Sequence, residues 1–160
     1  MTREKTDEWI GAVYKAPDRD TLKATYDTWA VSYDADMLLT GYLHYAMVTG
    51  LVSRHVTRKD AAILDAGVGT GALGSLLNLL GYNNLSGIDM SAGMLAKAAE
   101  RKCYSDLRQA VLGEKLDFVD KSFDAILSTG TFTEGHAPAS AFDELARLLE
   151  PGGVMIFTIS

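Results

Sequence analysis

The spacing of hydrophobic residues changes near residue 60 of this chain. In the first part, apolar side chains recur at the three- and four-residue spacing of a helix. These residues are Leu22, Tyr26, Trp29, Ala30 and Tyr33. Beyond residue 59, short apolar runs alternate with longer amphipathic stretches. The pattern predicts a helical leader over residues 1–58, followed by a core over 59–160 in which strands alternate with helices.

The core pattern is that of a parallel sheet, because strands that alternate with helices build doubly wound α/β folds. The run at 154–159 is almost wholly apolar, which is typical of a strand covered on both faces. Residues 151–153, Pro-Gly-Gly, are expected to turn the chain into it. The first predicted strand ends at residue 65, and the other four span 85–89, 107–112, 123–128 and 154–159. The predicted helices of the core span 72–80, 92–102 and 139–149.

A glycine-rich loop follows the first predicted strand. Its three glycines are Gly67, Gly69 and Gly71, and Asp65 precedes them. Glycine permits positive φ and a close approach of backbone to a ligand, and the helix that follows presents its positive N-terminal end. The loop therefore predicts a site for a nucleotide-type cofactor.

Two cofactors compete for this loop. Gly67-x-Gly69-x-x-Ala72 also fits the looser dinucleotide fingerprint, which favours NAD(P). Asp65, however, would repel a pyrophosphate and would attract the amino group and sulfonium of S-adenosylmethionine. An ordinary tight turn is the third interpretation.

Asp89 ends the second predicted strand, about 20 residues after the loop, which is the spacing of a carboxylate that binds ribose hydroxyls. Its two oxygens can accept hydrogen bonds from both the 2′ and the 3′ hydroxyl. Met90 is placed to cover one face of an adenine. Ser91 suits the N-cap of the next helix, and the alternative role for Asp89 is to cap that helix too.

These motifs together resemble those of class I S-adenosylmethionine-dependent methyltransferases of the type-11 kind. The resemblance rests on 63–71, Asp89, Ser122-Phe123-Asp124-Ala125-Ile126 and Leu148-Leu149-Glu150-Pro151-Gly152-Gly153, with 26–30 and 33–34 as a leader motif. The chain looks most like the methyltransferase-like group named after the Williams–Beuren syndrome region. The resemblance implies a Rossmann-like fold, S-adenosylmethionine as the cofactor and methyl transfer to a small-molecule acceptor.

The resemblance also implies where the cofactor lies. Leader tyrosines either pack against the core or form a lid over the cofactor. Leu112 stands where the family usually has an acid for the adenine amino group, and Glu114 is the nearest replacement. The predicted cofactor-binding residues are Tyr33, Asp65, Gly67, Gly69, Gly71, Asp89, Met90, Leu112, Gly113 and Ser128.

A catalytic base is needed only when the acceptor must lose a proton. His136 follows the fourth predicted strand, at the sheet edge where ligands bind, and is the predicted base, with Glu134 as the alternative. A solvated surface histidine is the competing interpretation. His44 and His55 are expected to serve structure or solvation, and the wide spacing of the three histidines predicts no metal site.

Composition fits a single domain of 160 residues with 48% hydrophobic residues. A net charge of −6 without a basic run argues against nucleic acid as a partner. The lone cysteine, Cys103, excludes an internal disulfide. No signal peptide or membrane-spanning run is evident, so the cytoplasm is the expected compartment.

The family sheet has seven strands, and the pattern here stops after the fifth. The apolar run at 154–159 would then form an unprotected edge, which favours self-association unless the leader covers it. A truncated form that binds the cofactor without turnover is therefore one alternative function. An NAD(P)-binding oxidoreductase is the second, and a protein or nucleic-acid methyltransferase is the third. The last lacks support, because the Asn/Asp-Pro-Pro-Tyr motif typical of such enzymes is replaced by Ser128-Thr129-Gly130-Thr131.

Overall fold

The computed structural model describes residues 2–159, which form an α/β fold around a five-stranded sheet. All strand pairs are parallel, and the strand order is β3-β2-β1-β4-β5. The strands are β1 (Ile63–Ala66), β2 (Leu85–Asp89), β3 (Asp106–Gln109), β4 (Phe123–Phe132) and β5 (Leu149–Ile159). The predicted parallel, doubly wound fold is confirmed.

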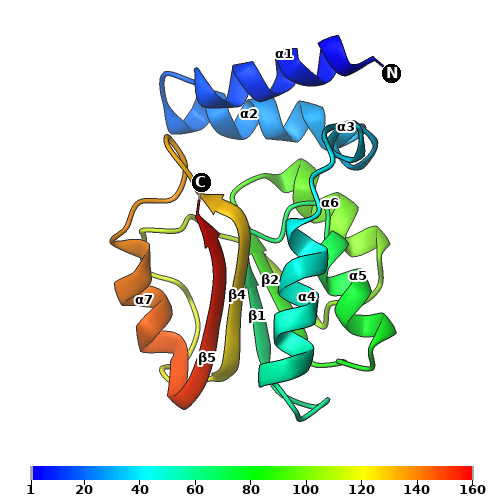
Figure 1. Ribbon diagram of the computed structural model, residues 1–160. Coiled ribbons are helices and arrows are strands. Elements are labelled where there is room, and N and C mark those ends of the chain that lie inside the picture. The colour runs from blue at the N-terminus through cyan, green and yellow to red at the C-terminus, as the bar shows by residue number, and fades with distance from the viewer. Residues whose placement is uncertain (1, 160) are drawn as a thin grey trace.

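The helices form three groups around the sheet (Figure 1). One face carries α7, the opposite side carries α4, α5 and α6, and the leader helices α1, α2 and α3 lie across the carboxyl ends of the strands. The helices are α1 (Arg3–Tyr14), α2 (Arg19–Trp29), α3 (Tyr33–Thr40), α4 (His44–His55), α5 (Ala72–Leu79), α6 (Ala92–Glu100) and α7 (Ala141–Leu148).

The bounds of β2 agree with the sequence-based prediction and β1 ends one residue later than expected, at Ala66, whereas the other three strands differ more. β3 was expected over 107–112 but ends at Gln109. Its last paired residue lies opposite Asp89, where the partner strand β2 ends, so the following residues have no strand to pair with. β4 continues past the expected residue 128 through an irregular register to the pair Phe132–Ile159. β5 begins at Leu149, so the expected turn at 151–153 is an irregular part of the strand.

The three core helices are one or two residues shorter than expected at the ends. α6 stops at Glu100 because Lys102 adopts a left-handed conformation, with φ +56°. α7 begins at Ala141 instead of residue 139. The Ala141 N–H donates to the Pro138 carbonyl, three residues earlier, so the chain just before α7 forms a turn tighter than an α-helix. The predicted cap of α6 is confirmed: the Ser91 hydroxyl accepts a hydrogen bond from the Met94 N–H at 3.0 Å.

Two hydrophobic clusters fill the layers beside the sheet. One joins α4 and α5 to the sheet through residues such as Val52, Leu77 and Tyr82, and the other packs α7 against it. The Tyr82 hydroxyl donates to the Val56 carbonyl at 2.6 Å, which ties α4 to the core. α4 therefore packs against the sheet as a core helix, although it falls within residues 1–58, which the sequence assigns to the leader. The predicted boundary at 58/59 stays a prediction.

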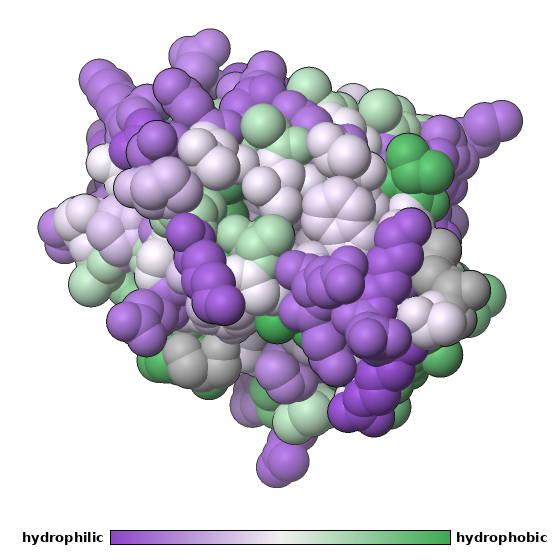
Figure 2. Space-filling view, turned by 90° about the horizontal axis from the view of Figure 1, so that it is seen from above, coloured by the Kyte–Doolittle hydropathy of each residue, from purple (hydrophilic) through white to green (hydrophobic). Residues whose placement is uncertain are grey.

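The leader helices pack on one another through Trp29. Its ring stacks on Trp9 at 5.9 Å and meets Tyr33 edge-on at 4.7 Å. The indole N–H donates to the buried Asp36 at 2.9 Å, and Asp36 also accepts from the Ser32 hydroxyl at 2.7 Å. Seen from above, the leader is hydrophilic around its margins with scattered hydrophobic patches (Figure 2). The leader thus packs around aromatic side chains, and its outer surface is mixed, with Val31, Leu38 and Leu39 exposed.

β5 lies at one edge of the described sheet. β5 has neighbours on both faces, as predicted: Val154 and Ile156 pack in the cluster with α4, and Met155 packs in the cluster with α7. Because the strand lies at the edge, only Ile156 is buried, while Phe157 and Ile159 are exposed. The leader lies over the strand ends and does not shield this edge (Figure 1). Self-association through β5 stays a prediction.

Candidate functional site

A cavity of about 720 Å³ lies between the leader and the carboxyl ends of the strands. Its walls come from the glycine loop, the end of β2, the loops after β3 and β4, and helices α2 and α3. Small-molecule and cofactor sites typically measure ~300–1,000 Å³ and occur at this edge of open α/β sheets. Position and size therefore mark this cavity as the candidate cofactor site.

The glycine loop crosses from β1 toward β2. The backbone N–H groups of Gly67 and Val68 both donate to the Ile88 carbonyl, at 2.9 and 2.8 Å. Gly67 has φ +83°, and a Cβ there would lie 2.3 Å from the Thr131 hydroxyl oxygen. Gly67 is therefore favoured both by its backbone conformation and by the close approach of Thr131, near the end of β4.

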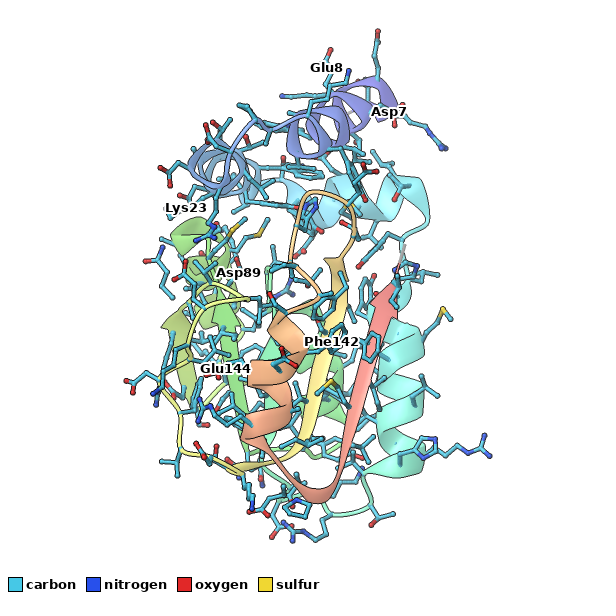
Figure 3. All side chains as sticks on the ribbon, turned by 90° about the vertical axis from the view of Figure 1, so that its left-hand side faces the viewer. Asp7, Glu8, Lys23, Asp89, Phe142 and Glu144 are labelled. Carbon is cyan, nitrogen blue, oxygen red and sulfur yellow. The ribbon has the colours of Figure 1, made fainter. Side chains whose placement is uncertain are left out.

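Asp89 is fixed by backbone groups on both sides. One oxygen accepts from the Gly69 N–H and the other from the Ser91 N–H, each at 2.9 Å. Burial raises the pKa of the Asp89 carboxyl, and these two N–H groups oppose the rise. Each carboxylate oxygen keeps a further lone pair. Asp89 lines the cavity below the leader (Figure 3), so it can accept from a bound hydroxyl without losing its present partners.

Asp65 lies behind the loop and not at the cavity. It is buried, and one oxygen accepts from the Tyr104 hydroxyl at 2.7 Å while the other has no hydrogen-bond partner. Burial raises the pKa of the Asp65 carboxyl to about 7; the Tyr104 hydrogen bond opposes this and the charge of Asp89 adds to it. The Tyr104 hydroxyl also accepts from the Gly74 N–H at 3.1 Å. Asp65 therefore holds the start of α5 through Tyr104.

The leader reaches the cavity through a Tyr-Asp pair that occurs twice, once in α2 and once at the start of α3. Tyr26 and Tyr33 both line the cavity. Burial is the largest cause that raises the pKa of each phenol above its ordinary value. Both hydroxyls are therefore neutral donors, and both rings offer electron-rich faces.

The aspartates of the two pairs contact the core instead. Asp27 accepts from the Ser91 hydroxyl at 2.6 Å and from the Gly93 N–H at 2.9 Å. Asp34 accepts from the Thr70 hydroxyl of the glycine loop and pairs with Arg101. The two aspartates thus bind the leader to the core at two places. Asp34 contacts the glycine loop, and Asp27 contacts the start of α6, next to Asp89.

His136 lies at the cavity in the loop after β4, and both of its ring nitrogens are engaged. Nε2 is 2.8 Å from the Tyr26 hydroxyl, while Nδ1 is 2.9 Å from the Thr133 hydroxyl and 3.0 Å from the Glu134 carbonyl. An Nδ1–H that donates to the carbonyl leaves Nε2 as an acceptor for the phenol. The histidine is therefore held by its neighbours, with Nε2 toward the leader.

The structure brings most of the predicted site residues to this cavity. Those that line it are Tyr33, Gly67, Gly69, Asp89, Met90, Leu112 and His136. Their contacts with a cofactor stay predictions. Glu114, the predicted substitute for the missing adenine acceptor, pairs with Arg19 and does not line it.

The other four predicted residues lie outside the lining, each for a physical reason. Asp65 bonds Tyr104, as described above. The Ser128 hydroxyl donates to the Ala66 carbonyl at 2.7 Å and joins β4 to β1. Gly71 and Gly113 adopt left-handed conformations that turn the chain, with φ +79° and +99°. Contacts of these four residues with a cofactor stay predictions.

Sequence reasoning missed several residues at or behind the cavity. The Tyr-Asp repeat was a visible signal for Tyr26 and Asp34, whereas Tyr104 falls in a stretch without any clear pattern. Further residues of the lining are Met37, Tyr42, Tyr45, Thr129 and Thr131. Across residues 2–159, no cluster of three or more His, Cys, Asp or Glu side chains could hold a metal. No helix in this range has the length and hydropathy needed to span a membrane.

Comparison with known proteins places this geometry in a family. A family model described as a methyltransferase domain matches residues 64–157, more than half of the chain. The match runs from β1 into β5 and includes the glycine loop and Asp89. A chain from the complex between the Haloferax volcanii Trm112 methyltransferase activator and a putative methyltransferase shares the fold, with a TM-score of 0.65 at 24% identity, over 81% of this chain and 57% of that one.

Two curated relatives agree with this match. Methyltransferase-like protein 27 from Homo sapiens is 32% identical over 152 residues, which cover 93% of this chain and 62% of the human protein. Malonyl-[acyl-carrier protein] O-methyltransferase from Methylococcus capsulatus is 28% identical over 152 residues, covering 93% and 54%. The chain spans less than two thirds of either relative, and the narrower Williams–Beuren grouping stays a prediction. The chain belongs to the methyltransferase-domain family of class I S-adenosylmethionine-dependent methyltransferases.

Proposed function

We propose that this protein transfers a methyl group from S-adenosylmethionine to a small-molecule acceptor. The observation that carries the proposal is the position of Asp89, whose carboxylate lines the cavity beside a glycine loop that it also fixes. Family membership supports the cofactor. The acceptor class is supported by the cavity alone, which is partly enclosed by the leader.

The residues present fit the cofactor. Free lone pairs of Asp89 suit the two ribose hydroxyls, and Met90 and Leu112 offer apolar contact for adenine. The left-handed Gly67 lets the loop turn tightly beside the cavity, where a Cβ would collide with Thr131. Tyrosine rings attract cations, and Tyr26 and Tyr33 are therefore suited to the sulfonium.

When bound, S-adenosylmethionine supplies a methyl group that is already activated for in-line displacement. The protein's own residues then need to orient the acceptor and exclude water, which can lower a barrier by several kcal/mol. Met37 and Tyr42 of the leader, together with Pro138 between β4 and α7, give the cavity apolar surface. This lining suits an acceptor with an apolar part.

His136 is the group placed to hold a proton from the acceptor. Nε2 faces the leader and is hydrogen-bonded to the Tyr26 hydroxyl. An acceptor hydroxyl or ammonium that takes the place of this phenol would meet the same nitrogen. His136 as a general base is thus part of the proposal, and the fixed Nδ1 supports it because it sets the ring orientation.

The names of the relatives are consistent with more than one acceptor type. One is named for a malonyl group on an acyl-carrier protein and another for phosphatidylethanolamine. Both cavity-lining arginines here are paired with acids: Arg19 with Glu114 and Arg101 with Asp34. This pairing disfavours an anionic acceptor, since no unpaired cation lines the cavity among the described residues.

Turnover is tested by incubating the purified chain with S-adenosylmethionine and pooled small metabolites and measuring S-adenosylhomocysteine release. We expect release only when an acceptor fraction is present, and a lower rate in His136→Gln. Methyl incorporation into protein or nucleic acid would contradict the acceptor class. Cofactor binding without release in any fraction would favour the form without turnover.

A further inference from the structure

The leader helix α2 is joined directly to the first turn of α6, beside Asp89. The Asp27 carboxylate uses one oxygen, Oδ1, for both the Ser91 hydroxyl and the Gly93 N–H, at 2.6 and 2.9 Å. Its other oxygen accepts from Lys23 at 2.7 Å. The two helices also meet without intervening side chains at this point, because a Cβ on Gly93 would lie 2.6 Å from the Asp27 carbonyl oxygen.

Ser91 connects Asp27 to Asp89. Its backbone N–H donates to Asp89 Oδ1, and its hydroxyl donates to Asp27 while accepting from the Met94 N–H. Ser91 is fully buried, so water does not replace these partners. In Figure 3, Lys23 of α2 lies above Asp89, in agreement with the contact between α2 and α6.

The Asp27 carboxylate is ionised across the physiological range. Burial acts to raise its pKa, but the Gly93 N–H, Lys23 and Ser91 outweigh this and lower it to about 2. A charged acceptor at a helix N-terminus is favourable, and its hydrogen bonds are stronger than neutral ones. The charged Asp27 carboxylate therefore accepts the hydrogen bond from the Ser91 hydroxyl throughout this pH range.

We propose that Asp27 is a positioning residue of the cofactor site, which holds Ser91 so that the Ser91 N–H fixes Asp89 for the ribose hydroxyls. The proposal rests on the proposed role of Asp89. In this proposal the leader does more than cover the cavity, because it also helps to orient the Asp89 carboxylate that binds the ribose. Loss of Asp27 frees the Ser91 hydroxyl and the Gly93 N–H, so the Ser91 N–H holds Asp89 Oδ1 less firmly, while the Gly69 N–H still binds Oδ2.

The test compares adenosine with 2′,3′-dideoxyadenosine, which lacks the hydroxyls that Asp89 would accept from. Dissociation constants are measured by calorimetry on the full chain. In the wild type we expect adenosine to bind more tightly. In Asp27→Ala, adenosine affinity should fall about fivefold to tenfold, the scale of one or two hydrogen bonds, while dideoxyadenosine affinity stays unchanged.

Three further variants separate positioning from folding. Asp27→Asn keeps an acceptor oxygen for Ser91 and Gly93 and should restore the preference for adenosine. Gly93→Ala should push α2 away and lower the preference as Asp27→Ala does, so it replaces that variant if the latter fails to fold. Asp20→Ala removes an exposed carboxylate from the same helix and should leave both affinities unchanged.

Two results would overturn the role of Asp27. Equal weakening of both nucleosides in Asp27→Ala would show a general structural effect, and an unchanged preference would show that Asp89 needs no support from the leader. A wild type without any preference for adenosine would instead overturn the ribose role of Asp89. That failure belongs to the proposed function and is visible before any variant is made.

Discussion

Asp89→Ala should weaken S-adenosylhomocysteine binding by about 1.5–3 kcal/mol, the range for hydrogen bonds to a charged group, which is roughly tenfold to 150-fold in the dissociation constant. The substitution removes the acceptor for the ribose hydroxyls. It also frees the Gly69 and Ser91 N–H groups that the carboxylate now binds. Calorimetric titration of the folded variant measures the loss.

Two matched variants make this result specific. Asp89→Asn keeps one acceptor oxygen and should fall between the wild type and the alanine variant. Asp117→Ala removes a fully exposed carboxylate and should bind as the wild type does. An unchanged dissociation constant in Asp89→Ala would mean that the residue only caps α6.

Asp65 should make the protein less stable as the pH rises from about 4 to 7. Its pKa is raised by burial from 3.8 to about 7 in the folded state. The folded protein therefore keeps a proton that the unfolded chain releases, and stability that is complete below pH ~4 is lost by about pH 7. A rise of this size corresponds to on the order of 4 kcal/mol in the free energy of unfolding.

Asp65→Asn isolates this effect, since the amide does not titrate and its oxygen can still accept from Tyr104. Denaturant unfolding at pH 5 and pH 8 should show a larger fall in stability for the wild type than for the variant. Asp60→Asn, at an exposed carboxylate, should follow the wild type. Parallel stability profiles for wild type and Asp65→Asn would contradict the raised pKa.

The sequence predicted those parts of the site whose chemistry lies in consecutive residues. A strand, a glycine loop and a helix start follow one another from Ile63 to Ala72, and Asp89 with Ser91 forms a second such unit. Helix caps and positive-φ turns depend on a few neighbouring residues, so their signals are local. For the same reason β1, β2 and the cap of α6 were predicted within a residue or two.

Contacts across the fold gave no such signal. The partner of Asp65 is Tyr104, 39 residues away, and His136 meets Tyr26 from 110 residues away. Only the packed structure shows that Asp65 is turned away from the cavity and that Asp27 reaches α6. The end of β3 was mistaken because it depends on where its partner β2 stops, and not on its own hydrophobic residues.

The central claim is that the cavity under the leader binds S-adenosylmethionine through the glycine loop and Asp89. Calorimetric titration of the purified chain with S-adenosylhomocysteine, and separately with NAD⁺, tests it most directly. We expect saturable binding of one S-adenosylhomocysteine per chain and no binding of NAD⁺ over the same concentrations. Saturable binding of NAD⁺ without any binding of S-adenosylhomocysteine would contradict it.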